Sequence, residues 1–548
     1  MSASMLLLSC GPSETPTSTS TATATATITA TTTATTTATA TGTATTTATP
    51  TSNLGDLAKP PGGIDGGRLQ LVAAGTILNI GDIIDQVAGP GDAAYAFPVV
   101  EPLLRLDGDG NFQPWLAERF EIAADFSSIT LWLRHGVKFT DGTDFNAAAV
   151  KYVIDVARAN PVYTNAWSLE SPVIINDYQV RIDFKDGQWN WDGAKGLATW
   201  WGEMMFSPKS LQDHANDPDW LKINCIGTGP FILTEFQRDQ KLVYQRNPNY
   251  WRGVPYLEGI DYQIIPDATT QLLAYKAGEV DMIGVQLKDV DRLKSEGFSI
   301  IQSEDMLFNY ALIPSSNNPD SPLADVRIRQ AIQYAINQQA IIDGITYGYG
   351  KPAQQEFCIA PYMDPNTVGY PYNVQAAKDL LTLAGHPDGI DITLTFNEFI
   401  PMDVPLALQD MFADAGIHLT FNKVSIIQFG AIIMSTGWEG LLYSYAFPGK
   451  TIDPGFTAGL YLGQPGTWIS TAKPPEIQAL IAEGAVEPDN TKRIAIFQEV
   501  SKMMTEQCLH QYVYYQGGFS SITPFLKGYT IGQYKEFFAY TFAYFDRS

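Results

Sequence analysis

The chain has 548 residues, of which 45% are hydrophobic and 17% charged, and this composition is typical of a folded globular protein. Its 58 acidic and 34 basic residues leave a formal net charge of −24, which disfavours binding to nucleic acid because phosphate backbones are also negative. The four cysteines and five histidines lack the spacing of a metal site. We therefore expect several folding units with no metal, no cofactor and no nucleic-acid partner.

The first ten residues read MSASMLLLSC, and their Leu-Leu-Ser-Cys ending resembles the lipobox of bacterial lipoproteins. The resemblance implies that Cys10 is lipidated and that the protein contacts the membrane only through this lipid; the alternative is a chance cysteine. A positive n-region and a full apolar stretch are missing, so residues 1–10 are interpreted as a truncated lipoprotein signal. Residues 11–65 are rich in Thr and Ala and predict a disordered stalk, because such residues cannot offset the entropy of ordering.

The folded part is expected to begin near Arg68, where LQLVAAGTI reads as a first strand. Apolar residues then alternate with others at Ile129, Leu131 and Leu133, which predicts a half-buried strand. A turn at residues 141–143 and an N-cap at Asn146 predict the start of a helix. Its apolar face is formed by Val150, Val153, Ile154 and Ala157.

The stretch from Gly227 to Trp251, GTGPFILTEFQRDQKLVYQRNPNYW, predicts a pair of strands at residues 231–236 and 241–245. Two glycines and Pro230 favour a turn before the pair. Tyr250 and Trp251 are expected to pack against the N-terminal part of the fold. We interpret this stretch as a structural element of the fold rather than as part of a functional site.

Residues 259–285 predict a strand, a helix and a second strand. Ile260, Tyr262 and Ile264 alternate, Asp267 can cap a helix over residues 268–277, and Gly278 can end it in a left-handed conformation. The second strand is expected at residues 280–285. Such a crossover predicts neighbouring parallel strands and an α/β sheet.

Two further helices are predicted in the C-terminal half. Pro322 and Asp325 precede VRIRQAIQYAINQQAII, which reads as one helix over residues 326–342. Its apolar face is formed by Ile328, Ala331, Ile332, Ala335 and Ile336. A second apolar stripe near the C-terminus consists of Ile496, Phe497, Val500, Met503 and Met504.

Four stretches together resemble the extracytoplasmic solute-binding proteins of ABC importers, family 5, which includes dipeptide, oligopeptide and nickel receptors. They are residues 133–150, 227–260, 274–283 and 322–337, and only Ala149 departs from the first motif, where the family usually has Asp. The resemblance implies an α/β fold of the two-lobed periplasmic-binding-protein type (type II, similar to cluster C). It also implies two crossover segments that join the lobes.

On this resemblance, lobe one comprises residues 66–308 and 515–548, and lobe two comprises residues 309–514. The crossings are expected near residues 309–313 and 510–517. The resemblance also implies an extracytoplasmic, lipid-anchored monomer that captures a small-molecule solute between the lobes. Its partners would be the permease and ATPase of an ABC importer.

The resemblance places one wall of the solute cleft at GLLYSYAFPGKTIDPGF, with Asp453 of the Asp-Pro pair as an anchor. Peptide receptors of the family often carry an acidic residue before this pair, but this chain has Tyr443, Tyr445 and Phe447 instead. Trp200 and Trp201 occupy the corresponding part of lobe one. These aromatic residues either contact the solute or pack in the ordinary core, and the solute is expected to be peptide-like, with an oligosaccharide as the alternative.

A second alternative is a secreted glycoside hydrolase that uses two carboxylates, for which Glu398, Glu439 and Asp453 are the candidates. The sequence contains no GxSxG, HExxH or P-loop motif, so we do not expect an enzyme. His510 lies near a predicted crossing, where ordinary hydrogen bonding is favoured over metal ligation. A disulfide among Cys225, Cys358 and Cys508 stays open at this point.

Overall fold

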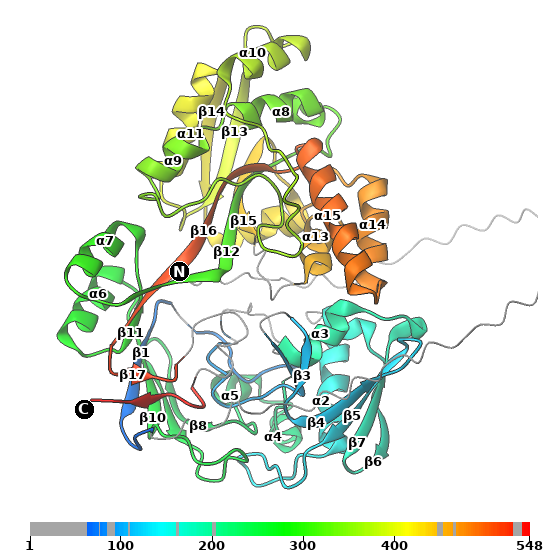
Figure 1. Ribbon diagram of the computed structural model, residues 1–548, viewed down its shortest axis with the longest axis vertical. Coiled ribbons are helices and arrows are strands. Elements are labelled where there is room, and N and C mark those ends of the chain that lie inside the picture. The colour runs from blue at the N-terminus through cyan, green and yellow to red at the C-terminus, as the bar shows by residue number, and fades with distance from the viewer. Residues whose placement is uncertain are drawn as a thin grey trace, which may run out of the picture.

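The computed structural model describes residues 63–548 except 76, 85–91, 93, 108–109, 161–163, 200–203, 447–452, 464–466, 530–539 and 548. Cys10, residues 1–62 and the predicted contacts Trp200, Trp201 and Phe447 lie outside the described residues. Within the described part, no helix is both long and apolar enough to cross a membrane. Figure 1 shows two parts of the fold, one above the other, with β12 and β16 running between them.

The lower part in Figure 1 contains two four-stranded sheets, ordered β1-β10-β9-β8 and β4-β5-β7-β6. The strands of the first are β1 (Arg68–Ala73), β8 (Phe231–Gln237), β9 (Lys241–Arg246) and β10 (Gly259–Ile264). Those of the second are β4 (Ala117–Ile122), β5 (Ser128–Leu133), β6 (Val173–Asn176) and β7 (Gln179–Asp183). Two short pairs are β2 (Leu104–Leu106) with β3 (Phe112–Pro114), and β17 (Leu526–Lys527) with β18 (Tyr544–Phe545).

Helices and helical turns also occur within residues 63–299, and the last two of them contact strands of the six-stranded sheet described below. They are α2 (Ala147–Ala159), η2 (Thr164–Ser168), η3 (Lys185–Gly187), α3 (Trp191–Thr199), α4 (Pro208–Asp213), α5 (Pro218–Ile223), α6 (Ala268–Ala277) and α7 (Leu287–Ser295). The predicted apolar face of α2 is fully buried, and Asn146 Oδ1 accepts from the amide of Ala149 at 3.0 Å. The sequence therefore predicted this strand, turn and helix correctly.

The stretch 227–251 forms the antiparallel pair β8 and β9, as predicted. Its end is fixed by the buried carboxylate of Glu101, which accepts from Trp115 Nε1, Thr228 Oγ1, Tyr250 Oη and Trp251 Nε1 at 2.7–2.9 Å. Burial raises the pKa of this carboxyl, while the four hydrogen bonds favour the ionised form. The packing expected for Tyr250 and Trp251 is thus confirmed.

The prediction for residues 259–285 is correct in its elements and wrong in its pairing. α6 has the predicted bounds, with Asp267 as its cap and Gly278 in a left-handed conformation (φ 76°). The second strand is only β11 (Met282–Gly284), and it pairs antiparallel with β16. The parallel neighbour of β10 is β1 instead, because the N-terminal strand takes the place beside β10.

A six-stranded mixed sheet of order β11-β16-β12-β15-β13-β14 forms the upper part in Figure 1, while its edge strand β11 lies beside β1 of the lower part. Besides β11, its strands are β12 (Ile300–Pro314), β13 (Ile390–Asn397), β14 (Ile417–Val424), β15 (Leu441–Ala446) and β16 (Gln511–Ile522). The helices of this part are η5 (Pro322–Ala324), α8 (Val326–Tyr334), α9 (Gln338–Gly344), α10 (Val374–Leu383), α11 (Asp403–Asp414), α12 (Ile426–Ala431), the π-helical turn η6 (Ile432–Thr436), α13 (Pro454–Leu462), α14 (Pro475–Val486) and α15 (Asn490–Glu506). Helices α8 to α11 contribute to one apolar core and α13 to α15 to another.

The predicted helix over residues 326–342 is divided in the structure. α8 ends at Tyr334 and α9 begins at Gln338, because Asn337 Oδ1 caps the second helix by accepting from the amide of Ala340 at 3.1 Å. The apolar face is nevertheless buried throughout residues 328–336, as predicted. A local cap therefore overrode the continuous apolar pattern.

β12 and β16 are the longest strands, and they pair antiparallel over most of their length. Near Ser520–Ile522, β16 pairs with β11, whereas farther along, β12 pairs with β15. Both predicted crossings, residues 309–313 and 510–517, overlap these two strands. The boundaries of the lobes themselves stay predictions, and we keep the names lobe one and lobe two for the ranges given above.

Candidate functional site

The sheet of lobe two presents the ends of three strands on the side from which β12 arrives. β13, β14 and β15 are mutually parallel, and β15 is antiparallel to β12. In this register Ala446, at the end of β15, is opposite Asn309, whereas Leu441 is opposite Pro314. The carboxyl ends of β13 to β15 therefore face lobe one, which is the edge where α/β sheets ordinarily bind ligands.

Exposed apolar side chains follow two of these strand ends. Phe399 comes after β13 and is 61% exposed, and Ile427 comes after β14 and is 59% exposed. Glu398, next to Phe399, is also exposed. Sequence reasoning missed Phe399 and Ile427 because both were identifiable only once the strand ends were known to share an edge.

A cluster of aromatic rings lies on the neighbouring strands. Tyr310 stacks on Tyr514 with ring centroids 4.6 Å apart, and it approaches Tyr445 at 5.6 Å. Phe308 meets Tyr445 edge to face at 5.5 Å. Tyr445, Phe308 and Tyr310 are half-buried, whereas Tyr443 is 1% exposed and belongs to the core of lobe two.

Tyr443 and Tyr445 thus occupy different environments, although both were predicted site residues. Burial raises the pKa of both hydroxyls, and the neighbouring Tyr514 adds to the effect on Tyr443. Both tyrosines are therefore neutral at physiological pH. Of the two, Tyr445 lies nearer the edge that faces lobe one, because it is the penultimate residue of β15.

Asp453 caps α13 and is buried in a cluster of three charged side chains. Arg493 Nη2 donates to its two oxygens at 2.5 and 2.6 Å, and the amide of Gly455 donates to Oδ1 at 2.8 Å. Lys195 Nζ of α3 lies 3.2 Å from Asp453 Oδ2. Burial alone would raise the pKa of Asp453, but Arg493 and Lys195 together lower it, so the carboxyl is ionised.

α3 belongs to lobe one and lies against helices of lobe two (Figure 1). Trp191 Nε1 donates to the carbonyl oxygen of Glu487 at 2.6 Å, and the guanidinium of Arg493 lies 4.9 Å from the Trp191 ring centroid. These contacts connect the lobes on the side away from β12 and β16. The predicted contacts Trp200 and Trp201 directly follow α3 but lie outside the described residues.

The carboxylates proposed for a hydrolase do not come together. Leu394 of β13 is opposite Leu441 of the parallel strand β15, so Glu398 follows one strand and Glu439 precedes the other. At about 3.3 Å per residue they are roughly 20 Å apart along the sheet, whereas paired catalytic carboxylates of glycosidases lie about 5–9.5 Å apart. Asp453 is buried in its ion cluster. This set of residues therefore lacks the geometry of a glycosidase.

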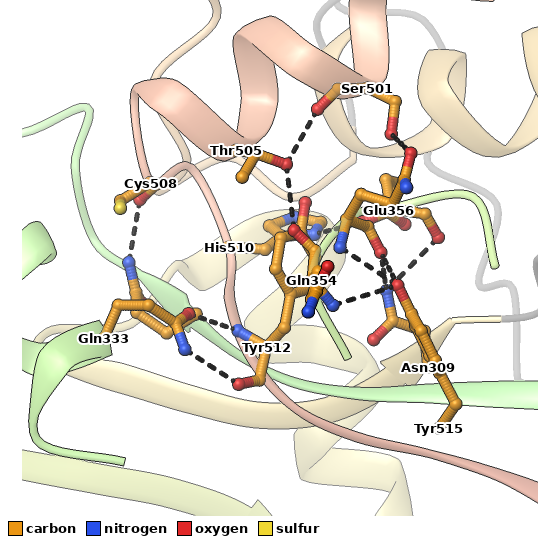
Figure 2. A network of polar contacts seen from close by, with 12 residues as sticks. Asn309, Gln333, Gln354, Glu356, Ser501, Thr505, Cys508, His510, Tyr512 and Tyr515 are labelled. Carbon is orange, nitrogen blue, oxygen red and sulfur yellow. Dashed lines mark hydrogen bonds and ion pairs between the residues drawn. The ribbon is translucent and has the colours of Figure 1, made fainter. Parts of the chain in front are cut away.

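His510 forms part of a buried polar network near the start of β16 (Figure 2). Its Nδ1 lies 2.8 Å from Glu356 Oε2, while Tyr515 Oη donates to the carbonyl oxygen of Gln355 at 2.5 Å. Asn309 Nδ2 donates to the carbonyl oxygens of residues 355 and 356. The segment around Glu356 is thus tied to both long strands at the crossing.

No group of three or more metal-binding side chains occurs within the described residues. Cys225, Cys358 and Cys508 are buried and free, so the disulfide that the sequence left open is not formed among them. Burial raises the pKa of the Cys508 thiol to about 12. All three cysteines therefore behave as small core residues.

Comparison of the sequence with known proteins identifies relatives over most of the chain. Heme-binding protein A of Haemophilus influenzae is 27% identical over 457 residues, which cover 77% of this chain and 82% of that protein. A putative ABC transporter peptide-binding protein of Brucella ovis is 27% identical over 469 residues, with coverages of 79% and 86%. The glutathione-binding protein GsiB of Salmonella typhi is also 27% identical, over 357 residues and with coverages of 63% and 67%.

Solved structures share the fold. NikA from Brucella suis, in complex with Fe(III)-EDTA, has a TM-score of 0.76 at 23% identity and covers 88% of this chain and 100% of its own. The oligopeptide-binding protein AppA from Bacillus subtilis, in complex with a nonapeptide, has a TM-score of 0.74 at 18% identity with the same coverages. The expected two-lobed periplasmic-binding-protein fold is thereby confirmed.

A family model settles the relationship between this chain and its relatives. The model for bacterial extracellular solute-binding proteins, family 5, matches residues 111–462, which is more than half of the sequence. The match includes most of lobe one, the crossing in β12 and most of lobe two. The chain therefore belongs to family 5 of the bacterial extracellular solute-binding proteins.

Proposed function

We propose that this protein captures a peptide-like solute between its lobes and delivers it to the permease and ATPase of an ABC importer. The observation that carries the proposal is the edge of the lobe-two sheet, where Phe399, Ile427 and half-buried Tyr445 lie at strand ends that face lobe one. Apolar walls with a few oriented polar groups are the usual way to hold a small solute. Trp200, Trp201 and Phe447, which lie outside the described residues, stay proposed solute contacts.

The relatives support a peptide-like solute. The Brucella ovis protein is named a putative ABC transporter peptide-binding protein, and GsiB is named for glutathione, which is itself a peptide. Solved structures of the same fold hold a nonapeptide and the peptide STSA. One relative is named a heme-binding protein and the NikA structure holds Fe(III)-EDTA, so the solutes of these similar proteins are not peptides alone.

Glu398 is the proposed partner for the ammonium group of the solute. Asp453 is already bonded to Arg493 and Lys195, and the aromatic stretch before it supplies no carboxylate. Glu398 is exposed at the same edge as Phe399 and Tyr445. A carboxylate at this position would bind an amine through a charge-assisted hydrogen bond, with the apolar side chains beside it.

A thermal-shift screen of the purified protein against peptides and oligosaccharides tests the function. A solute present at 100 times its Kd should stabilise the folded state by about 2.7 kcal/mol and raise the Tm. Peptides are expected to raise it. Turnover of a chromogenic glycoside, with no solute from either library raising the Tm, would overturn the proposal.

Substitution of Glu398 tests the ammonium contact. Glu398→Gln should weaken the binding of peptides with a free amino terminus about ten- to a hundredfold, because hydrogen bonds to charged groups contribute about 1.5–3 kcal/mol, and should leave N-acetylated peptides unaffected. Glu439→Gln is the matched control, since Glu439 is exposed at the opposite end of the same sheet. Equal losses for both kinds of peptide, measured by titration calorimetry, would remove Glu398 from this role.

An oligosaccharide is the second candidate, and the exposed ring of Phe399 favours it because aromatic faces stack on sugar rings. In the same screen, oligosaccharides alone would then raise the Tm.

We also propose lipid anchoring through Cys10 on the extracytoplasmic face and a monomeric state. Cys10→Ser should release the protein from the membrane fraction, and light scattering should give the mass of one chain.

A further inference from the structure

We propose that the charge of Lys195 opposes closure of the lobes, so that bound solute, rather than the empty protein, supplies the free energy of closing. This inference rests on the proposed function only in that the lobes open and close. It depends on no particular solute. It assigns to one side chain of α3 the role of keeping the unoccupied protein open.

Lobe two holds a complete ion pair without any help from lobe one. Arg493 donates to both oxygens of Asp453, to the carbonyl oxygen of Gly484 at 2.8 Å and to Tyr362 Oη at 2.8 Å. The amide of Gly455 adds a further bond to Asp453. All of these partners lie in lobe two, so the pair persists when the lobes separate.

Lys195 is therefore a second cation beside a carboxylate that is already neutralised. Its Nζ lies 3.2 Å from Asp453 Oδ2, which is longer than the 2.6 Å bond that Arg493 Nη2 makes to the same oxygen. The side chains of Lys195 and Asp453 are only 8% and 4% exposed, and that of Arg493 is 0% exposed. Closing thus removes an ammonium from water and leaves the three-residue cluster with a net charge of +1.

The free energy of this step is dominated by desolvation. Removing an ion from water is costly, and the attraction of a partner offsets the cost only when the geometry is excellent and further hydrogen bonds satisfy the remaining polar groups. Here Arg493 also repels Lys195. When the lobes open, Lys195 regains water while the Asp453–Arg493 pair loses little.

The pKa of Lys195 is lowered, as expected if burial in the closed arrangement disfavours its charge. Burial lowers its pKa, Asp453 and Asp192 of α3 raise it, and Arg493 lowers it further, with a net result below the ordinary value. Among the described residues, the elements packed against α3 also bring Arg105 of β2 and Glu487, at the end of α14, to this region. Because the closed form then binds fewer protons than the open form, raising the pH should favour closure.

A protein with Lys195 substituted can still close, because other contacts between the lobes do not involve this side chain. Trp191 still donates to the carbonyl oxygen of Glu487 and still lies beside the Arg493 guanidinium. Lys195→Met retains most of the side-chain volume and removes only the charge. Lys195→Arg retains the charge.

Small-angle X-ray scattering of the unliganded full chain at pH 7 tests the proposal. Lys195→Met should shift the open–closed equilibrium toward the compact form by about tenfold and reduce the radius of gyration, because it removes the cost of burying the ammonium while Asp453 keeps its bonds to Arg493 and to the amide of Gly455. Lys195→Arg should leave it at the wild-type value. Lys209→Met is the matched control, because Lys209 pairs with Asp213 on the surface of lobe one.

A second measurement keeps the test independent of folding. Raising the pH from 7 toward 10 should compact the wild-type protein and have a smaller effect on Lys195→Met. An unchanged or larger radius of gyration in Lys195→Met, with an unchanged Tm, would overturn the proposal, and an increase would show that the ion pair holds the lobes together. Since no solute is added, failure here is distinct from failure of the solute screen.

Discussion

At the scale of single residues, the same chemistry serves different purposes according to burial. Glu398 and Asp453 are both carboxylates of lobe two, yet the first is exposed at a strand end and the second is enclosed by two cations. Glu101 is buried as well, but its four partners are neutral donors. The partners of each side chain, which come from distant parts of the chain, distinguish the proposed solute contact from the structural anchors.

Asp453→Asn should destabilise lobe two, because it leaves Arg493 buried without its counter-charge. The expected loss in the free energy of unfolding is about 3–5 kcal/mol, measured by urea denaturation. The pKa of Asp453 is lowered in the folded state, so its stabilisation is present above the ordinary value of 3.8 and is lost as the pH falls through the folded value. A variant with wild-type stability at pH 7 would contradict this role.

At the scale of elements, local signals placed the three predicted helix starts correctly. The caps Asn146, Asp267 and Asp325 each accept from a backbone amide of the first turn. Two predictions were wrong. The sequence did not predict that β11 pairs with β16, and it did not predict that the cap Asn337 divides one apolar stretch into two helices. Pairing is decided by contacts distant in sequence, so periodicity alone does not determine it.

Asn337→Ala should remove the N-cap of α9 and lower the free energy of unfolding by about 1 kcal/mol. Gln339→Ala on the same helix is the control, because Gln339 is exposed and its change should stay within about 0.5 kcal/mol. Urea denaturation of both variants provides the comparison. Equal losses for the two would argue that helix propensity, rather than capping, is responsible.

At the scale of the whole molecule, two lobes with separate apolar cores are joined by β12 and β16 and by the contact of α3 with lobe two. The contact of α3 with lobe two is small compared with the cores of the lobes, and such an interface favours motion of one lobe relative to the other. The closed form is then useful only when the solute binds it more tightly than the open form. The charge of Lys195 fits this requirement, since it disfavours closure of the empty protein.

Calorimetry of the unliganded protein should show two unfolding transitions, one for each lobe, because the apolar core of lobe one is separate from those of lobe two. A bound solute contacts both lobes and should bring the transitions together while raising them. Asp453→Asn should lower mainly the transition of lobe two. One transition that Asp453→Asn shifts as a whole would show instead that the lobes unfold as a single unit.

The sequence by itself determined the family, the α/β class and the local elements that carry clear caps or periodicity, because motifs, caps and periodicity are properties of neighbouring residues. It also indicated the aromatic stretch that contains Tyr443 and Tyr445. Only the tertiary structure decided that Tyr443 is core, that Phe399 and Ile427 share an edge with Tyr445, and that Lys195 meets Asp453. These relations join residues that are far apart in the chain, and they arise from strand register and lobe packing, which no local pattern encodes.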